Sequence, residues 1–436
     1  MASYAQKLRK NLRHLIQEMG KEATLFSKRP GHDFTREGKL GFEKTVSILL
    51  SLEGKSLNNE LLDFFPNAPD LPSAAALVQN RAKLHPDALP TLFHRFATTQ
   101  KADKLFRGYR LLAADGSTLH IPYNPAAPDT NVVFRENQQP CSLLHLHALY
   151  DLSCKTYVDA LVEGVRGFNE QKALIQMVKD SQISHAILLA DRGYESYNVL
   201  AHIQKKGWKF LVRLKDASGI VSGLLLPDHD PFDVSFDLLI SCKSSQAAKA
   251  LYADKNRFKF VPASKFDYSE FDLTQDDFAR LQFRIVRFRV SDDLTETVIT
   301  NLDRDQFPAE DLKALYFRRW GIESSFRKLK YTLGLLHFHA KKVEHIHQET
   351  FARLIMYNFF ELITSHTIIL KKDRQYAYQV NFSVAVHICR RFFRGNVSPP
   401  LLETLLSRYI LPIRPGRSFP RTPPPRGVVS FTYRVA

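Results

Sequence analysis

The chain has 436 residues, 44% hydrophobic and 24% charged, a composition typical of a folded protein with two or more domains and not of a disordered chain. Its 61 basic residues exceed its 45 acidic residues and give a formal net charge of +16, which favours a polyanionic partner over a basic protein or a cationic substrate. We find no apolar run of about 18 residues, no apolar leader and no C-x-x-C spacing among the four cysteines, so we expect a cytoplasmic protein without a membrane span, disulfide framework or structural zinc site.

Residues 1–104 are predicted to form a helical domain. Helices are expected from a capping Ser3 to about Gly20, and over residues 40–52, 57–65 and 73–84. Basic side chains recur along this region, and a small basic helical domain is suited to docking on DNA. We therefore predict a DNA-binding domain. The alternative is a basic surface that only keeps the protein in solution.

From about residue 105 the pattern changes to short apolar runs typical of strands. Strands are expected over residues 110–121, 143–150, 156–162, 185–190 and 208–214, with helices over 169–179 and 196–206. The first strand contains Asp115 before Gly116, and the fourth ends at Asp191 before a turn at Gly193. This alternation predicts an α/β layer over residues 105–215, in which ligand chemistry gathers at strand ends.

The second half of the chain is predicted to contain an insertion and the rest of the α/β layer. Residues 216–278 are rich in Pro, Phe and Val and are interpreted as a β-rich insertion. The layer resumes over residues 279–365, with strands expected over 282–290 and 297–302 and helices over 311–333 and 345–369. Residues 366–436 are predicted to form a C-terminal helical region and basic tail. Arginines of this tail are suited to lie along a phosphate backbone: Arg414, Arg417, Arg421 and Arg426.

The helix predicted over residues 311–333 carries two stripes of side chains. At about 100° per residue, one arc of roughly 60° holds Tyr316, Arg319, Glu323 and Lys330. An apolar stripe beside it holds Leu315, Ile322, Phe326, Leu329 and Leu333. One carboxylate, two cations and a phenol thus line the border of a buried face, a position suited to the floor of a cleft. An amphipathic helix with merely solvated charges is the alternative.

Three acidic residues, Asp115, Asp191 and Glu323, are the candidate catalytic residues and metal ligands. Close carboxylates repel one another, whereas two divalent cations about 4 Å apart would activate a water or 3′-hydroxyl and stabilise the leaving oxygen. Oxygen ligands favour Mg²⁺, with Mn²⁺ as a substitute. Taken singly, an aspartate beside a glycine is often only part of a turn. The remaining polar residues of the helix are then placed to bind DNA phosphates: Tyr316, Arg319 and Lys330.

Two sets of motifs resemble those of a known family. The Y-(2)-R-(3)-E-(6)-K spacing of Tyr316, Arg319, Glu323 and Lys330 resembles the signature of DDE transposases of the insertion sequence four family. The family's first catalytic aspartate motif is similar to Asp115-Gly116-Ser117, and its second is similar to Asp191-Arg192-Gly193-Tyr194. The resemblance covers most of the chain. It implies an RNase H-like core, Mg²⁺-dependent strand cleavage and transfer, and synapsis of two transposon ends by a homodimer.

In studied members the family also implies a hairpin intermediate. Some relatives are thought to stack a tryptophan of the insertion on a flipped base. Both tryptophans of this chain, Trp208 and Trp320, lie outside residues 216–278, so the sequence leaves the hairpin step open.

The prediction for function is a cut-and-paste DNA transposase, a bacterial protein associated with the nucleoid. Its partners are double-stranded DNA at the terminal inverted repeats and at the target, with no role for a membrane. The alternatives are an RNase H-like nuclease without strand transfer and a domesticated, non-catalytic DNA-binding protein. A weaker candidate is a metal site at the histidine pairs His145/His147, His337/His339 or His345/His347, which have no cysteines at zinc spacing.

Overall fold

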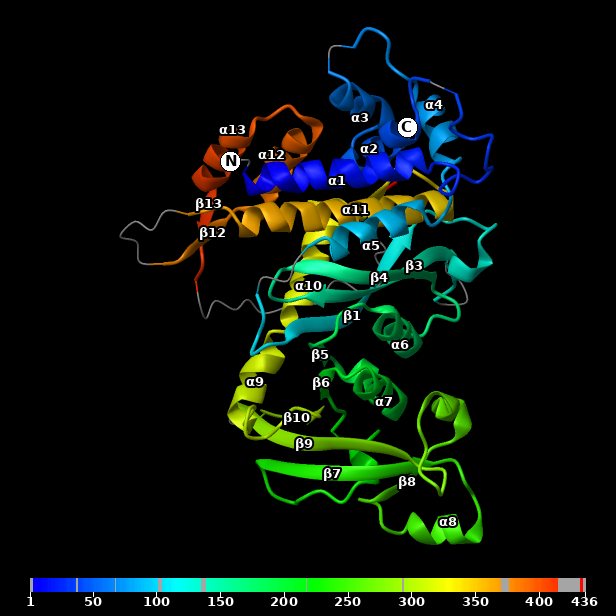
Figure 1. Ribbon diagram of the computed structural model, residues 1–436, viewed down its shortest axis with the longest axis vertical. Helices are drawn as coiled ribbons and strands as arrows, with labels where there is room; N and C mark the ends of the chain where they lie inside the picture. The colour runs from blue at the N-terminus through cyan, green and yellow to red at the C-terminus, as the bar shows by residue number, and fades with distance from the viewer. Residues whose placement is uncertain are drawn as a thin grey trace.

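The computed structural model describes residues 3–36, 38–66, 68–100, 104–134, 139–216, 218–291, 294–369, 376–414 and 432–433 (Figure 1). Most of the predicted basic tail, including Arg417, Arg421 and Arg426, lies outside these ranges. Within them, every helix is too short or too polar to cross a lipid bilayer. The four cysteines are free thiols.

The elements follow one another as helices, then a mixed α/β region, then helices again. The helices are α1 (Tyr4–Lys21), α2 (Phe42–Ser51), α3 (Leu57–Phe64), α4 (Ala74–Arg81), α5 (Ala88–Thr98), α6 (Glu170–Asp180), α7 (Tyr197–Lys205), α8 (Gln246–Leu251), α9 (Ala309–Phe317), α10 (Trp320–Arg327), the π-helical turn η6 (Lys328–Thr332), α11 (Val343–Ser365), α12 (Phe382–Arg394) and α13 (Pro399–Arg408). The strands are β1 (Arg110–Ile121), β2 (Asn131–Val132), β3 (Cys141–Asp151), β4 (Thr156–Gly164), β5 (Ala186–Ala190), β6 (Lys209–Arg213), β7 (Phe232–Ser241), β8 (Phe258–Phe260), β9 (Ala279–Ser291), β10 (Leu294–Thr300), β11 (His337–Phe338), β12 (Tyr378–Val380), β13 (Ile410–Pro412) and β14 (Thr432–Tyr433).

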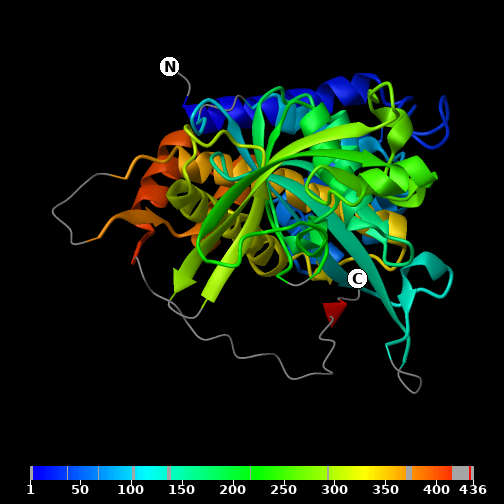
Figure 2. The same ribbon diagram turned by 90° about the horizontal axis from the view of Figure 1, so that it is seen from below.

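One large mixed sheet forms the centre of the molecule. Its order is β2-β3-β1-β5-β6-β10-β9-β7-β8, and β4 pairs with the part of β3 that β2 does not cover. Across β4, β3 and β1 the pairs are antiparallel, whereas β1, β5 and β6 run parallel. The predicted RNase H-like α/β core is confirmed in these five strands. Figure 2 shows the strands fanned out by the twist usual for sheets of L-residues.

Both faces of the core strands are buried, as the continuous apolar run of β5 requires. Alternate side chains of β5 enter two different hydrophobic clusters. Leu188 packs with residues of α6 and α7, whereas Ile187 and Leu189 pack with residues of α9. The helices on the two sides thus fix the sheet between them and hold the end of β5 in place.

Residues 216–278 add strands to this same sheet and do not form a second one. β7 pairs antiparallel with β9 from Phe232 to Ile240, and β8 pairs parallel with β7. Figure 1 shows this part at the end of the molecule opposite α1 and α11, with α8 at its edge. Since β10 also pairs with β6, the hairpin of β9 and β10 connects the added strands to the core.

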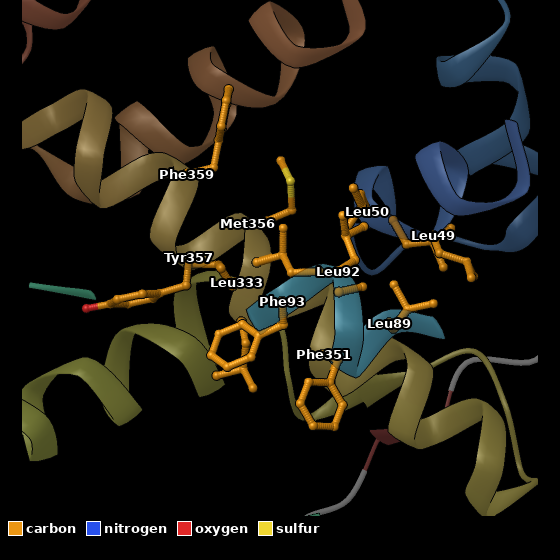
Figure 3. Close-up of a cluster of buried hydrophobic side chains, with 14 of the residues drawn as sticks. Leu49, Leu50, Leu89, Leu92, Phe93, Leu333, Phe351, Met356, Tyr357 and Phe359 are labelled. Carbon is orange, nitrogen blue, oxygen red and sulfur yellow. The ribbon is translucent and has the colours of Figure 1, made fainter. Parts of the chain in front are cut away.

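The N-terminal helices share a hydrophobic core with α11. Figure 3 shows Leu49 of α2, Leu92 and Phe93 of α5, and Phe351 and Met356 of α11 in one cluster. No helix was predicted over α5. Pro90 is the third residue of this helix. A proline inside a helix normally breaks it, but a proline in the first turn removes no helical hydrogen bond.

A buried network of ion pairs joins α4 to α11. The Nη1 of Arg81 lies 2.9 Å from Oε1 of Glu349, and each side chain is only 1% exposed. A second guanidinium nitrogen, Nη2, donates to the carbonyl oxygen of His345 at 2.7 Å. On its other oxygen, Glu349 faces Nδ1 of His339 at 3.2 Å. The contacts satisfy charges that would otherwise be costly to bury.

This network is expected to make stability depend on pH. Although burial acts to lower the pKa of His339, hydrogen bonds to Glu349 and Glu60 raise it from 6.5 to about 9. The stabilisation is therefore full below pH 6.5 and is lost as the pH rises through about 9. Removing the imidazole by His339→Gln should cost roughly 2–3 kcal/mol at pH 6 and little at pH 9.5. Urea unfolding at both pH values measures the difference.

The exposed His14→Gln variant is the control for this measurement, because His14 is 60% exposed. Its free energy of unfolding should match that of the unaltered protein at both pH values. An equal loss for His339→Gln at pH 6 and pH 9.5 would contradict the expected titration.

Candidate active site

The parallel pair of β1 and β5 brings the two predicted aspartates to one edge. Ala113 of β1 pairs with Leu189 of β5, and two residues further along each strand lie Asp115 and Asp191. Each aspartate is held by a glycine that follows it. The Oδ1 of Asp115 accepts a hydrogen bond from the next backbone N–H, and Oδ1 of Asp191 accepts one from the N–H of Gly193, both at 2.8 Å.

The position of Asp115 along its strand is set by the neighbouring strands. β1 continues to pair with β3 as far as Ile121, but its pairing with β5 ends at Ala113. Asp115 thus lies within β1, at the point where β5 has ended and the α/β layer opens. Such a position at a strand end is where ligand chemistry gathers in α/β folds.

The prediction of a single helix over residues 311–333 is wrong. The segment forms α9 and α10, followed by the π-helical turn η6. Between the two helices, the amides of Arg318 and Arg319 bond to carbonyls three residues back, at 3.1 and 3.0 Å, instead of four. The chain also packs tightly here, since a Cβ on Gly321 would lie 2.7 Å from Cδ2 of Leu152. Close approach to the β3–β4 turn thus accompanies the interruption.

Despite the interruption, the charged stripe of this segment faces the aspartates. The Nη2 of Arg319 donates a hydrogen bond to Oε1 of Glu323 at 2.8 Å, and its Nη1 lies 4.0 Å from Oδ2 of Asp115. The guanidinium is also 5.7 Å from the ring centre of Tyr316. Arg319 is only 7% exposed, so it is a buried cation between two of the three carboxylates.

The carboxyl group of Asp115 is influenced by the charges of both other carboxylates. Burial is the largest cause that raises the pKa of Asp115 to about 6, and the negative charges of Asp191 and Glu323 raise it further. The hydrogen bond from Gly116 and the charge of Arg319 act in the opposite direction. The ionised form of Asp115 is therefore destabilised as the cluster stands, and an added cation would favour it.

Lys330 contacts β1 at Thr118, three residues beyond Asp115. Its Nζ donates to the carbonyl oxygen of Thr118 at 2.8 Å, and burial lowers the pKa of its ammonium group. Figure 1 shows α10 beside β1, which brings the segment ending in η6 along this strand. The predicted apolar stripe is buried on the inner side: Leu315, Ile322, Phe326, Leu329 and Leu333.

The donor set fits a hard divalent cation in chemistry. Asp115, Asp191 and Glu323 offer carboxylate oxygens, the type of ligand that hard divalent cations prefer. In the part of the chain that the structure describes, no three acidic, histidine or cysteine side chains stand together as a ready metal site. Arg319 instead supplies the positive charge, so a metal ion would take over contacts that this guanidinium now makes.

The histidine pairs considered as metal ligands do not form such a site. His339 belongs to the buried network of Glu349, and His345 offers its backbone carbonyl to Arg81.

Trp208 is buried, and its indole N–H donates to a backbone carbonyl at 2.9 Å. Trp320 is 43% exposed, at the start of α10 beside Arg319.

One acidic residue near the aspartates was missed by the sequence analysis. Glu170, the first residue of α6, lies close to both Gly116 and Gly193. The only local signal is the capping Asn169, whose Oδ1 accepts from the N–H of Lys172 at 3.0 Å. A cap places an acid in the first turn of a helix, but it does not reveal which strand ends the helix will face.

Comparisons with known proteins identify the family of the chain. The profile of the family described as "Transposase DDE domain" matches residues 106–359, which contain all six candidate site residues. Among curated proteins, none matches the chain. A solved structure, described as a cryo-EM structure of piggyBac transposase synaptic complex with hairpin DNA, is similar with a TM-score of 0.44 and 10% identity, over 94% of this chain and 84% of that one. Because the family profile covers more than half of its length, the chain belongs to the transposases with a DDE domain, enzymes that act on DNA.

Proposed function

We propose that this protein is a cut-and-paste transposase, which hydrolyses the DNA backbone at the ends of its transposon and joins the freed 3′-hydroxyl to target DNA. The main support is the position of Arg319 between Asp115 and Glu323, with the charge of Asp191 also acting on Asp115. These residues lie within the region that matches the DDE family.

The three carboxylates would hold the divalent cations, two Mg²⁺ ions for which Mn²⁺ substitutes. When bound, such ions supply the positive charge that activates an attacking water or 3′-hydroxyl and stabilises the leaving oxygen. The chain's own contribution is rigidity. β1 and β5 fix Asp115 and Asp191, and the N–H of Gly116 and of Gly193 orient their carboxylates.

The neighbouring polar side chains would bind the DNA phosphates around the reacting bond. Once cations lie among the carboxylates, Arg319 is available to donate paired hydrogen bonds to a phosphate. Lys330 adds a positive charge further along β1, at Thr118. Tyr316 lies beside Arg319, and its hydroxyl would donate to a phosphate oxygen.

Residues 1–104 would bind the transposon ends, and two copies of the chain would hold two ends together as a homodimer. Support comes from an open cleft between the α1–α2 loop and α4. Its basic lining residues are Arg29, His32, Arg36, Lys39 and Lys83. Such a surface attracts phosphates through a term that does not depend on base sequence and weakens with salt.

The test is an assay with labelled transposon ends and a target plasmid. With Mg²⁺, the protein is expected to release cleaved ends and to form joined products, whereas EDTA should abolish both. Native gels and sequencing of the junctions measure the two steps. Cleavage without joined products would favour a nuclease, and binding without cleavage would favour a non-catalytic DNA-binding protein.

Replacing Arg319 by lysine is expected to lower the rate of end cleavage by roughly 10²-fold, because lysine keeps the charge but cannot make the paired hydrogen bonds of a guanidinium. Single-turnover cleavage rates and gel-shift affinities separate this effect from DNA binding, which should change little. The control is Arg327→Lys, because Arg327 is an exposed arginine at the other end of α10. A normal rate for Arg319→Lys would show that paired hydrogen bonds are not needed.

A further inference from the structure

Glu170 lies between the two glycines that follow the catalytic aspartates. A Cβ on Gly116 would be 2.9 Å from Oε1 of Glu170, and a Cβ on Gly193 would be 3.2 Å from its Oε2. The same position at Gly193 is 3.0 Å from Oδ1 of Asp191. One carboxylate oxygen of Glu170 and one of Asp191 therefore share the small space beside Gly193, and a side chain at Gly116 would meet both His145 and Glu170.

Two buried histidines of β3 lie behind this carboxylate. The Nε2 of His145 is 3.2 Å from Oε1 of Glu170, and the ring centre of His147 is 4.4 Å from that of His145. Phe168 stacks on His145 at 4.3 Å and covers it from outside. His145 is 5% exposed and His147 is fully buried. Within the described residues, the Nδ1 atoms of both rings lack a hydrogen-bond partner, which is costly for buried polar groups.

The arrangement has the form of a supported carboxylate next to a site for cations. Glu170 begins α6, where the backbone N–H groups stabilise a negative charge. His145 limits the carboxylate on one side, and the two glycines leave room for it on the other. Unsatisfied ring nitrogens beside it are places where ordered water would bind.

We propose that Glu170 is a fourth carboxylate of the active centre, which binds the divalent cation held by Asp115 and Asp191 through a water molecule, with His145 as the residue that positions it. This inference rests on the proposed function, since it assigns an outer ligand to the same centre. Groups of this kind orient the inner ligands and commonly change metal affinity by about 10–100-fold.

The experiment measures binding of Mn²⁺ to the full-length protein without DNA, by the electron paramagnetic resonance signal of free Mn²⁺. Glu170→Gln is expected to raise the Kd for Mn²⁺ about 10-fold, with an unchanged melting temperature in EDTA. Glu170→Asp, which restores the charge, should recover part of the affinity. The matched control is Glu163→Gln, because the exposed Glu163 has an oxygen 3.5 Å from Nε2 of His147 but lies away from both glycines. Its Kd should stay within about twofold of the original value.

An equal Kd for the unaltered protein and Glu170→Gln overturns the proposal, as does a lower melting temperature without a change in Mn²⁺ affinity. A protein that binds Mn²⁺ with the expected difference but joins no DNA contradicts the proposed transposition and leaves the role of Glu170 standing. If the unaltered protein binds no Mn²⁺ at all, both are overturned.

Discussion

Replacing Asp191 by asparagine or Glu323 by glutamine is expected to lower the rates of end cleavage and of strand transfer by about 10³-fold or more. Each substitution keeps the size of the side chain and removes one negative charge. In the proposed mechanism, the centre would then lose one of the negatively charged oxygens that hold the cations. Because neither side chain belongs to a hydrophobic cluster, the fold and the affinity for DNA should be retained.

The rates are measured under single-turnover conditions with labelled ends and Mg²⁺, alongside gel-shift titrations. Glu310→Gln serves as the control, because Glu310 is an exposed glutamate in the first turn of α9, within the same segment as Glu323. It should cleave at the original rate. If Asp191→Asn and Glu323→Gln still cleaved normally, the three carboxylates would not be the catalytic centre.

Replacing Arg81 by alanine is expected to lower the free energy of unfolding by about 3–5 kcal/mol. The change removes the ion pair with Glu349 and the hydrogen bonds to Gln348 and to the backbone of His345. Glu349 would stay buried without its closest ion-pair partner, whose charge now helps His339 and Arg353 to hold its pKa well below 4.5. Removing one partner of a buried ion pair is among the costliest changes in a protein interior.

Urea unfolding followed by circular dichroism measures this loss. Lys44→Ala provides the comparison, since Lys44 is exposed on α2 in the same helical region and should change stability by less than about 0.5 kcal/mol. Because the N-terminal helices share one core with α11, we expect Arg81→Ala to weaken the whole helical end of the molecule. A loss no greater than that of Lys44→Ala would show that the buried pair contributes nothing net to stability.

Much of the α/β core was determined by local sequence. The apolar run of β5 and its end at Asp191 are readable because a strand buried on both faces needs an unbroken apolar segment. The start of α6 at the capping Asn169 and the end of α7 before β6 are likewise determined by neighbouring residues. The spacing of Tyr316, Arg319 and Glu323 also survived the interrupted helix, because residues three and four apart stay on one side over a single turn.

Other features depended on contacts that a local pattern does not contain. Helix α5 was missed because Pro90 favours a break, whereas burial of Leu92 and Phe93 against α11 makes the helix favourable. The interruption between α9 and α10 coincides with the close approach of Gly321 to Leu152, a residue far away in the sequence.

The tertiary structure alone decided which charges meet. The sequence supplied the three acidic residues and the cations near one of them, since spacing along strands and helices determines which face a side chain takes. It did not supply the position of Arg319 between Asp115 and Glu323, or that of Glu170 beside both aspartate loops. Those positions follow from the parallel pairing of β1 with β5 and from the packing of α6 and α10 on opposite sides of the sheet. Such long-range packing depends on the whole chain and not on local sequence.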